Sequence, residues 1–583
     1  MSYNEIDKLM KEGDYDKALT LIEQLPPEEV SRGLSAKCGI LSVRGQHQDA
    51  IQLANEVIHE SKEKSDQLAA LLALFWKLNS LMLMNEFGDF DESAKEINDL
   101  AQLGVSQDNQ FETKEWISML YGLQGMKASW AGNYEKSMEM GKKGLALANE
   151  ITSPMAKAYS LYAISCPLRD TEKITRAFEY VNKSLDIAQQ YNLKPILCLI
   201  YHSLDLLYRI KGDLTNSLKY SNLALTLGQE MKMKFVIDFI TGNVGHQPAA
   251  LGNYDQAIEL FKEGYRLAQA RNDFWVMTQR LNDIGHVYRI KGELSLALST
   301  FEESLALSKK IGNEFFQSKT YQAIGMVYYD QGSYQQALET FQRSLSIVSG
   351  VAPKSLSITS TLLALVSLNV ELDNINDAKQ YLTQLEDINK SEKSDNIKIN
   401  YQFAKALVLK ASPRMKNKAQ AQAIFETIAE NTKNPHETIT FAMYNLCELL
   451  LYEFRSESES EILNEIKTLS QRLYNIGVEL NVFPTTIKAL LLQAKLSLVE
   501  GNLNKVEVLL KEAQQIAQEK GLGKLLTMVT QEQEQIKSEL DKWNSFIVRN
   551  TPIQERIAQA ALESYIKSAL QIIDVGQDEK PPS

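Results

Sequence analysis

The chain has 583 residues, which is too many for one ordinary compact core, so we expect several domains or an elongated repeat array. It is 44% hydrophobic and 23% charged, which is the usual balance for a folded protein. The formal net charge of −12 argues against a general nucleic-acid binder, because an acidic chain repels phosphate backbones.

The N-terminal segment, residues 1–19, is charged and amphipathic and has no apolar core of the kind a signal peptide needs. The most apolar run, residues 71–84, is interrupted by polar residues and is too short to cross a bilayer, so we expect a buried helix there. The cysteines lie far apart, at Cys38, Cys166, Cys198 and Cys447. They form no CxxC pair, and we expect buried free thiols in a reducing cytosol. These features predict a cytoplasmic protein without membrane insertion.

Glycines recur at a spacing of 40 residues, at Gly212, Gly252, Gly292 and Gly332. The same anchor occurs elsewhere at Gly13, Gly45, Gly88, Gly132 and Gly501. Five residues after most of these glycines lies a small residue, as at Ala297 and Ala337. A glycine at a helix end supplies the positive φ of a tight turn, and a small residue lets two helices approach closely. The pattern therefore predicts repeated pairs of antiparallel helices.

The clearest repeats are residues 281–305 and 321–345, which resemble tetratricopeptide repeats. The large and small positions of the family are matched at Leu281, Ile284, Gly285, Tyr288, Gly292, Ala297, Phe301 and Ser304. The period is longer than the ~34 residues usual in that family. Longer helices of this kind resemble the repeats of kinesin light chains, spindle-orientation scaffolds and bacterial peptide-sensing regulators. A helical pair cannot bury its apolar face alone, so we predict an all-α fold, a right-handed superhelical solenoid of stacked pairs.

We divide the chain into five segments by the quality of the repeat pattern. Residues 1–195 carry N-terminal repeats, 196–350 regular repeats, 351–523 degenerate repeats, 524–574 capping helices and 575–583 a flexible tail. In the capping segment we expect one long amphipathic helix through Ile547. A final helix should follow from Ile553 to Ile573, with Thr551 as its N-cap. These helices either cover the last open face of the array or serve in dimerisation or docking.

The sequence contains none of the common catalytic motifs. The chain has no P-loop, kinase set, GxSxG or HExxH motif, and no cysteine–histidine pairing at a known spacing. The glycine-rich stretches are helix turns without preceding strands, so they do not indicate nucleotide binding. We therefore predict that the protein is not an enzyme and that it holds no metal and no cofactor.

The resemblance implies a concave groove lined by the first helix of each pair, with exposed positions about ten, six and three residues before the anchoring glycine. By that comparison one groove would be lined by His202, Arg209, His246, Asn282, His286, Arg289, Gln322 and Tyr329. The motif YRIKG occurs twice and places Arg209 and Arg289 on the same face. Guanidinium and imidazole groups in a groove would hold a carboxylate or an acidic peptide. The alternative is that these polar side chains are simply solvated.

One repeat departs from the pattern. Residues 241–252, TGNVGHQPAALG, place Gly242, Gly245 and Pro248 in a single helix. Proline removes a backbone hydrogen bond and collides with the preceding turn, at a cost of ~3 kcal/mol. Gly245 and Pro248 therefore mark either a tolerated kink or a hinge that opens the groove beside His246.

Two function hypotheses follow. The first is a non-enzymatic scaffold that binds a protein or peptide, with an acidic or C-terminal segment as the expected ligand. The second is a regulator whose array closes on a peptide or small molecule and controls a partner. The carboxylate clamp of chaperone-binding relatives is not reproduced, since Asp283 and Ala323 occupy two of its positions. We expect binding to weaken with salt, and to strengthen towards pH 6 if the imidazoles protonate in their ordinary range.

Overall fold

The computed structural model describes residues 2–64, 66–84, 86–97, 110–130, 133–170, 173–211, 213–270, 272–351, 355–391, 395–431, 434, 436–457 and 460–571. Throughout these ranges the regular structure is helical, with no β-strand. No helix within them has the length and apolarity needed to span a membrane.

Helices follow one another as antiparallel pairs, and the first helix of each pair is called an A helix and the second a B helix. The A helices are α1 (Tyr3–Glu12), α3 (Val30–Val43), α5 (Gln67–Leu83), α8 (Gln110–Trp130), α10 (Pro154–Asp170), α12 (Lys194–Ile210), α17 (Phe274–Lys291), α19 (Glu314–Asp330), α21 (Leu356–Glu371), α23 (Asp395–Lys410), α25 (His436–Glu457) and α27 (Phe483–Glu500). The B helices are α2 (Tyr15–Ile22), α4 (His47–Glu63), α6 (Phe87–Ala94), α9 (Tyr134–Glu150), α11 (Ile174–Gln190), α13 (Leu214–Glu230), α16 (Tyr254–Gln269), α18 (Leu294–Lys310), α20 (Tyr334–Val351), α22 (Ile375–Ser391), α24 (Met415–Glu430), α26 (Ser460–Glu479) and α28 (Leu503–Glu519). The predicted all-α, right-handed superhelical solenoid is confirmed.

The repeat chemistry explains the pairs. Gly292 and Gly332 adopt φ of 80° and 75° at the turns between A and B helices, as predicted. Ala297 and Ala337 are fully buried, which confirms their place at close helix contacts. Gly88 is an exception, because it lies inside α6 and the turn falls before it. The anchors Gly132 and Gly212 lie outside the described residues.

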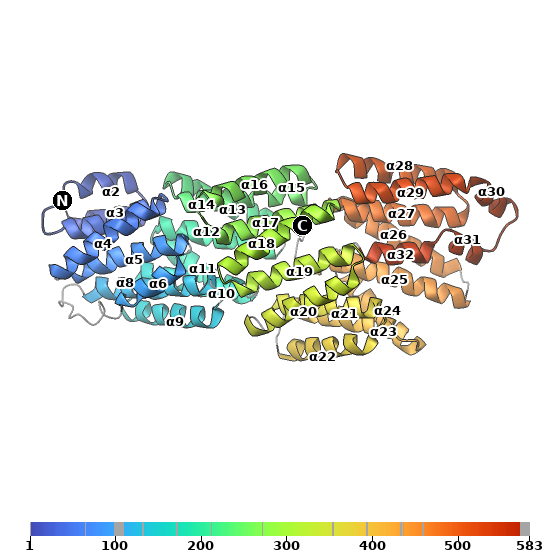
Figure 1. Cartoon of the computed structure of the whole chain (residues 1–583), viewed down its shortest axis with the longest axis horizontal. Helices are drawn as coiled ribbons and strands as arrows, with labels where there is room; N and C mark the ends of the chain where they lie inside the picture. Colours follow the sequence, from blue (N-terminus) through green and yellow to red (C-terminus); the bar gives the residue numbers. More distant parts are fainter. Residues whose placement is uncertain are drawn as a thin grey trace.

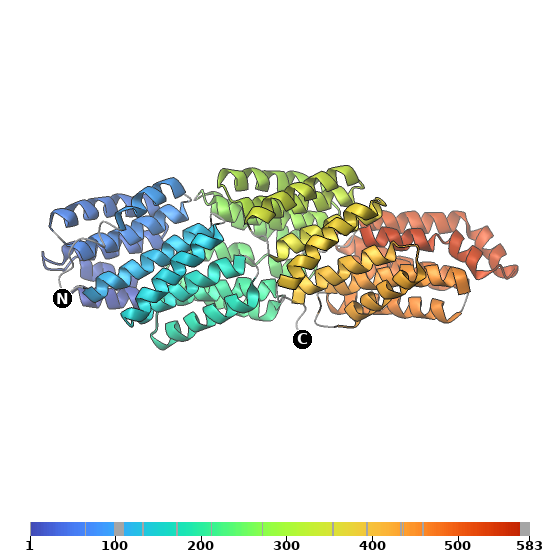
Figure 2. The same ribbon diagram turned by 90° about the horizontal axis from the view of Figure 1, so that it is seen from below.

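The superhelix is wound tightly enough for successive turns to touch. Figures 1 and 2 show an elongated molecule with the N-terminal pairs at one end and the last helices at the other. Trp130 of α8 stacks on Trp275 of α17 with ring centroids 5.3 Å apart. Further along, Lys524 Nζ donates to the main-chain oxygen of Asp330 at 3.1 Å. These contacts join residues 145 and 194 positions apart in the sequence, so the groove inside the superhelix is walled in along part of its length.

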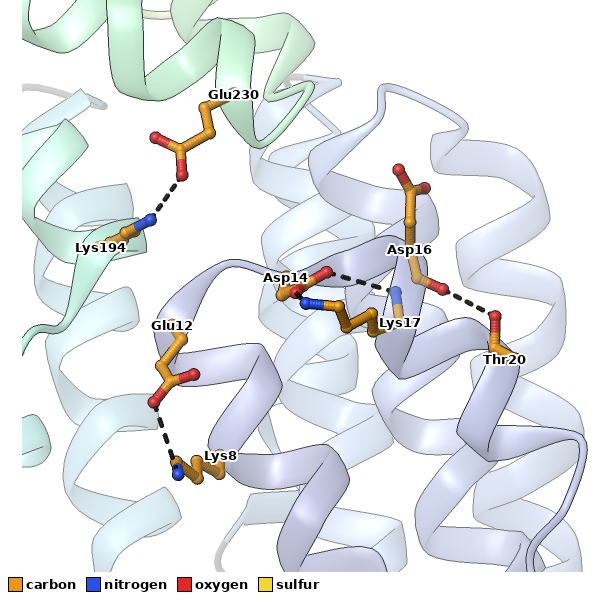
Figure 3. A network of polar contacts seen from close by, with 8 residues as sticks. All are labelled: Lys8, Glu12, Asp14, Asp16, Lys17, Thr20, Lys194 and Glu230. Atoms are coloured by element: carbon orange, nitrogen blue, oxygen red, sulfur yellow. Dashed lines mark hydrogen bonds and ion pairs between the residues drawn. The ribbon is translucent and has the colours of Figure 1, made fainter.

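The first such contact joins the N-terminal pair to the turn after α13. Figure 3 shows Asp14 in the loop between α1 and α2 and Asp16 in the first turn of α2, near the ion pair of Lys194 and Glu230. Asp16 also pairs with Lys232, at 2.9 Å. A Cβ added to Gly13 would collide with Met231, so this glycine serves the close approach as well as the turn.

The departing repeat, residues 241–252, is broken rather than merely kinked. Its A element consists of α14 (Lys234–Asn243) and α15 (His246–Ala250), with Val244 and Gly245 between them. The two large clusters of buried apolar residues also divide here, one running from Tyr3 to Ile240 and the other from Tyr254 to Ala569. The hinge prediction for Gly245 and Pro248 concerns motion and stays a prediction.

The C-terminal helices differ from the prediction in three ways. The long helix is interrupted at Glu539 and forms α29 (Gly523–Ser538) and α30 (Leu540–Val548). The final helix is also two, α31 (Ile553–Gln559) and α32 (Leu562–Gln571), because Ala561 between them has a φ of 48°, which no continuing helix adopts. Thr551 is not the N-cap. Pro552 is the N-cap residue, and it has no side-chain oxygen to accept a hydrogen bond from the first N–H groups of the helix.

Candidate functional site

A cavity of about 780 Å³ runs between the A helices in the middle of the superhelix. Its lining begins at Ser129 in α8 and extends to Leu525 in α29, so side chains from many successive pairs contribute. The cavity is within the size range of ordinary ligand sites, but it is built along the array rather than within one repeat. An elongated site of this kind suits an extended ligand.

The described lining carries an excess of positive charge. Its basic side chains are Arg169, Arg209, Arg280, Arg289, Lys291, Lys319, Lys488 and Lys524. Its acidic side chains are Asp283, Asp330, Glu437 and Glu479. The lining is therefore twice as rich in basic as in acidic groups, although the whole chain has a net charge of −12. A positively charged cavity attracts anionic ligands in preference to neutral or basic ones, even though the protein as a whole is acidic.

Most of the predicted groove residues come together in this cavity. The lining includes Arg209, His246, Asn282, His286, Arg289 and Gln322. His202 and Tyr329 are not part of it. His202 is buried beneath the cavity wall, with 7% of its surface exposed. Tyr329 is half-buried and stacks obliquely on Tyr334, with ring centroids 5.7 Å apart.

The two arginines of the YRIKG motif have different surroundings. Arg289 Nε donates to Asp330 Oδ2 at 2.6 Å, and both side chains are 4% exposed. Arg209 is half-buried, and its Nη1 has no hydrogen-bond partner among the described residues. Arg289 is therefore largely neutralised within the fold, whereas Arg209 lines the cavity with its Nη1 buried and without a hydrogen-bond partner among the described residues.

A buried polar network lies beside Arg209. Arg280 of α17 is 1% exposed and donates through Nη2 to Asn243 Oδ1 at 2.9 Å. Asn243 Nδ2 in turn donates to Asp205 Oδ2 at 3.2 Å, and Ser217 donates to the other carboxylate oxygen at 2.6 Å. Burial raises the pKa of Asp205, and the nearby Arg209 lowers it in part. The network fixes one wall of the cavity in a single arrangement.

The glycines of the departing repeat make room for this network. A Cβ on Gly242 would lie 3.0 Å from Arg280 Cδ, and one on Gly264 would lie 2.6 Å from Gly242 Cα. A Cβ on Gly245 would lie 2.7 Å from the ring of Phe261. Close backbone approach between α14 and α16 therefore creates the space in which the Arg280 guanidinium lies over Phe261, 5.7 Å from the ring centroid.

Two buried histidines, His202 and His246, are neutral. Burial lowers the pKa of His202 and of His246 well below 6.5, and the neighbouring arginine charges lower it further. His246 Nε2 lies 3.6 Å from Asp283 Oδ2, beyond an ordinary hydrogen bond. The expectation that these two imidazoles charge near pH 6 is therefore wrong, because charging them would place a cation in a buried and already positive site.

The far end of the cavity contains a buried lysine. Lys488 of α27 is 1% exposed and lines the cavity near Lys524. Burial lowers its pKa to about 7, and Lys524 and Arg289 lower it while Asp330 raises it. Its Nζ donates to the main-chain oxygen of Ala569 in α32, at 3.2 Å.

Sequence reasoning missed several of these residues. Arg280, Asn243, Asp205 and Lys488 do not occupy the positions that the family comparison marks as exposed. The glycines of the departing repeat were a usable signal for Arg280. Gly242 lies against the Arg280 side chain, and Gly245 lies against Phe261, over which the guanidinium is placed. Lys488 gave no local signal, since its partners are more than seventy residues away in the sequence.

The described residues hold no group of three or more His, Cys, Asp or Glu side chains arranged for a metal ion. All four cysteines are buried free thiols, as predicted. Burial raises the pKa of Cys38, Cys198 and Cys447 to about 12, so these thiols are poor nucleophiles at neutral pH.

Comparison with known proteins identifies the repeat type. The family model of the MalT-like TPR region matches residues 206–537, more than half of the chain. None of the curated protein sequences matches.

Three of the similar solved structures are matched over nearly their whole length but over only part of this chain. A Rap protein complexed with competence and sporulation factor shares 16% identity over 63% of this chain and 99% of that chain, with a TM-score of 0.45. The apo quorum sensor NprR of B. thuringiensis shares 13% over 70% and 99%, with a TM-score of 0.38. Aspartyl phosphate phosphatase F from Bacillus subtilis shares 14% over 64% and 96%, with a TM-score of 0.36. The family of this chain is shown by the match of residues 206–537 to the family model, and not by the similarity to these structures.

Proposed function

This chain belongs to the family of MalT-like TPR regions, and we propose that it is a non-enzymatic scaffold that binds a protein or peptide in the cavity inside its superhelix. The observation that carries the proposal is the positive lining of that cavity in a chain of net charge −12. Because the lining is supplied by successive A helices, it follows an extended ligand along its length.

The expected ligand is an acidic segment or a C-terminal carboxylate. Arg209 supplies the anchoring contact, since it lines the cavity, its buried Nη1 has no hydrogen-bond partner among the described residues, and a guanidinium favours paired hydrogen bonds to a carboxylate. Arg280 lies buried behind it, and Asp283, 3.4 Å from its Nη2, offsets part of its charge. Arg289 contributes less, because Asp330 offsets its charge.

We further propose that the protein works by binding rather than by turnover. This fits the high pKa of the buried Cys38 and Cys198 thiols and the neutral state of His246. We also assign it to the cytoplasm, where four free thiols stay reduced.

A ligand-responsive regulator is the second candidate, and one observation favours it. Contacts between superhelical turns are made by residues of the cavity lining itself. Asn313 Nδ2 donates to the main-chain oxygen of Trp130 at 2.6 Å, and Lys524 reaches Asp330 from the other side. A ligand between these walls would shift the balance between a closed and an opened array.

The test is fluorescence anisotropy with labelled acidic peptides and matched peptides in which Asp and Glu become Asn and Gln. Wild-type protein should bind the acidic form more tightly, and salt should weaken that binding. Arg209→Ala should weaken it by about ten-fold, the loss expected for one charge-assisted contact. Arg266→Ala is the control, since Arg266 lies on α16 with its side chain 59% exposed. Equal binding by both variants, or no preference for the acidic form, would refute the proposal.

A further inference from the structure

The last helix of the chain does not extend the array. α32 turns back and packs against α25 and α27, which are A helices and belong to the inner surface of the superhelix. Leu562, Ile566 and Ala569 are fully buried there, and Tyr565 is 7% exposed. These residues follow the i, i+3, i+4, i+7 spacing of one helix face. α32 therefore lies where a helical ligand of this array would lie.

Two of the polar contacts that hold this segment go to its main chain, and a third runs from the Tyr565 hydroxyl to the main-chain oxygen of Lys488, at 2.6 Å. Lys488 Nζ donates to the oxygen of Ala569 in the last turn of α32, at 3.2 Å. Lys495 Nζ donates to the oxygen of Ala560 at the end of α31, at 3.0 Å. The last carbonyls of a helix have no partner within it, so these two buried lysines recognise helix ends rather than particular side chains.

Three features indicate that the fit of α32 is imperfect. Tyr444 of α25 is fully buried, and its hydroxyl has no hydrogen-bond partner among the described residues. The joint between α31 and α32 places Ala561 at a φ of 48°, a left-handed conformation that disfavours alanine. α31 has no buried residue and no side-chain cap.

We propose that the inner surface of α25 and α27 is a helix-binding groove, that α32 is its exchangeable occupant, and that it accepts an amphipathic helix from a partner protein when α32 leaves. The partner helix presents apolar residues at the spacing of Leu562, Ile566 and Ala569, and its last carbonyls reach Lys488 and Lys495. The groove differs from the anion-binding stretch around Arg209, because its contacts are apolar or made to main chain.

The probe is a labelled peptide of residues 551–571, added to full-length protein. In one host, Leu562→Arg and Ile566→Arg dislodge α32 from the groove. In the control host, Ser564→Arg changes the exposed face of the same helix. The double variant should bind the peptide at least about ten-fold more tightly than wild type and the control host do. A peptide carrying Ile566→Arg should not bind.

Equally weak binding to all three hosts, with intact helical circular dichroism, would overturn the proposal. Formation of a dimer that exchanges α32 between copies, without peptide binding, would overturn it in favour of a second copy as occupant. Hydrogen exchange of the unmodified chain provides a check that needs no variant. Amides of α32 should exchange faster than those of α27, and equal protection of both helices would refute exchangeability.

Discussion

Arg289 and Asp330 form an ion pair of 2.6 Å across the A helices α17 and α19, with both side chains 4% exposed. Arg209, the equivalent arginine of the other YRIKG motif, makes no such ion pair among the described residues, and its Nη1 has no hydrogen-bond partner there. Identical local sequence has therefore placed both arginines on the cavity but has produced one that is paired within the fold and one that is not. The difference comes from the neighbouring repeat, which supplies an aspartate only to Arg289.

We expect Arg289→Ala to destabilise the fold strongly. The substitution leaves the Asp330 carboxylate buried without its partner, and breaking a buried ion pair in this way costs about 3–5 kcal/mol. Arg209→Ala should change the free energy of unfolding by less than about 1 kcal/mol. Urea denaturation measures both. The double variant Arg289→Ala, Asp330→Ala should recover part of the loss, and a similar small effect of both single variants would contradict this assignment.

Gly292 and Gly332, at the ends of their A helices, form a matched pair. Substituting each by alanine separates the cost of a left-handed backbone from the cost of a clash between successive turns of the superhelix. Gly292 and Gly332 have φ of 80° and 75°, but a Cβ on Gly292 would lie 2.5 Å from Lys524 Cβ, whereas one on Gly332 meets nothing within 4 Å. Gly332→Ala should therefore cost about 1–2 kcal/mol, from the left-handed backbone alone. Gly292→Ala should cost clearly more in urea denaturation. Equal costs would mean that the contact between turns contributes nothing.

Close packing within a pair is tested at Ala297, which is fully buried against Phe301, Ile324 and their neighbours. Ala297→Leu should overpack this contact and lower the free energy of unfolding by about 1–3 kcal/mol. The adjacent Leu296 is 49% exposed, so Leu296→Ala serves as the control and should have little effect. An unchanged denaturation midpoint for Ala297→Leu would contradict the helix register.

The buried histidines predict a loss of stability in acid. Unfolding exposes His202 and His246, whose pKa returns to about 6.5, while the folded state keeps them neutral at much lower pH. The unfolded chain thus binds more protons, and the free energy of unfolding falls as the pH drops from about 7 to about 5. The variant His202→Asn, His246→Asn should show a shallower pH dependence of the melting temperature. His59→Asn is the control, because that side chain is 81% exposed, and identical slopes for both variants would refute the explanation.

The repeat architecture was predictable because its determinants are local. A glycine such as Gly332 and a small residue such as Ala337 report a turn and a close contact within one pair, and each is repeated along the chain. The breaks at Glu539 and Ala561 were not predictable in this way, because the apolar spacing continues through both positions. There the packing of α30 and α32 against other helices outweighs helix propensity.

The candidate site was predictable only in part. The positions of Arg209, His246, His286 and Arg289 on the cavity follow from repeat spacing. Their chemistry does not, since it depends on residues brought close by the winding of the superhelix. Asp330 neutralises Arg289, and burial beside Arg280 keeps His246 uncharged. Such partners lie tens of residues away, where local pattern carries no information.

The central claim is that an acidic ligand binds inside the superhelix, and photo-crosslinking tests it most directly. A short acidic peptide with a benzophenone group would be irradiated with full-length protein, and the attachment sites mapped by mass spectrometry. The account predicts attachment to cavity-lining segments such as 206–210 and 279–291, with loss of crosslinking in Arg209→Ala. Attachment to the B helices α20 and α22, which contribute no residue to the described cavity lining, unchanged by Arg209→Ala, would contradict it.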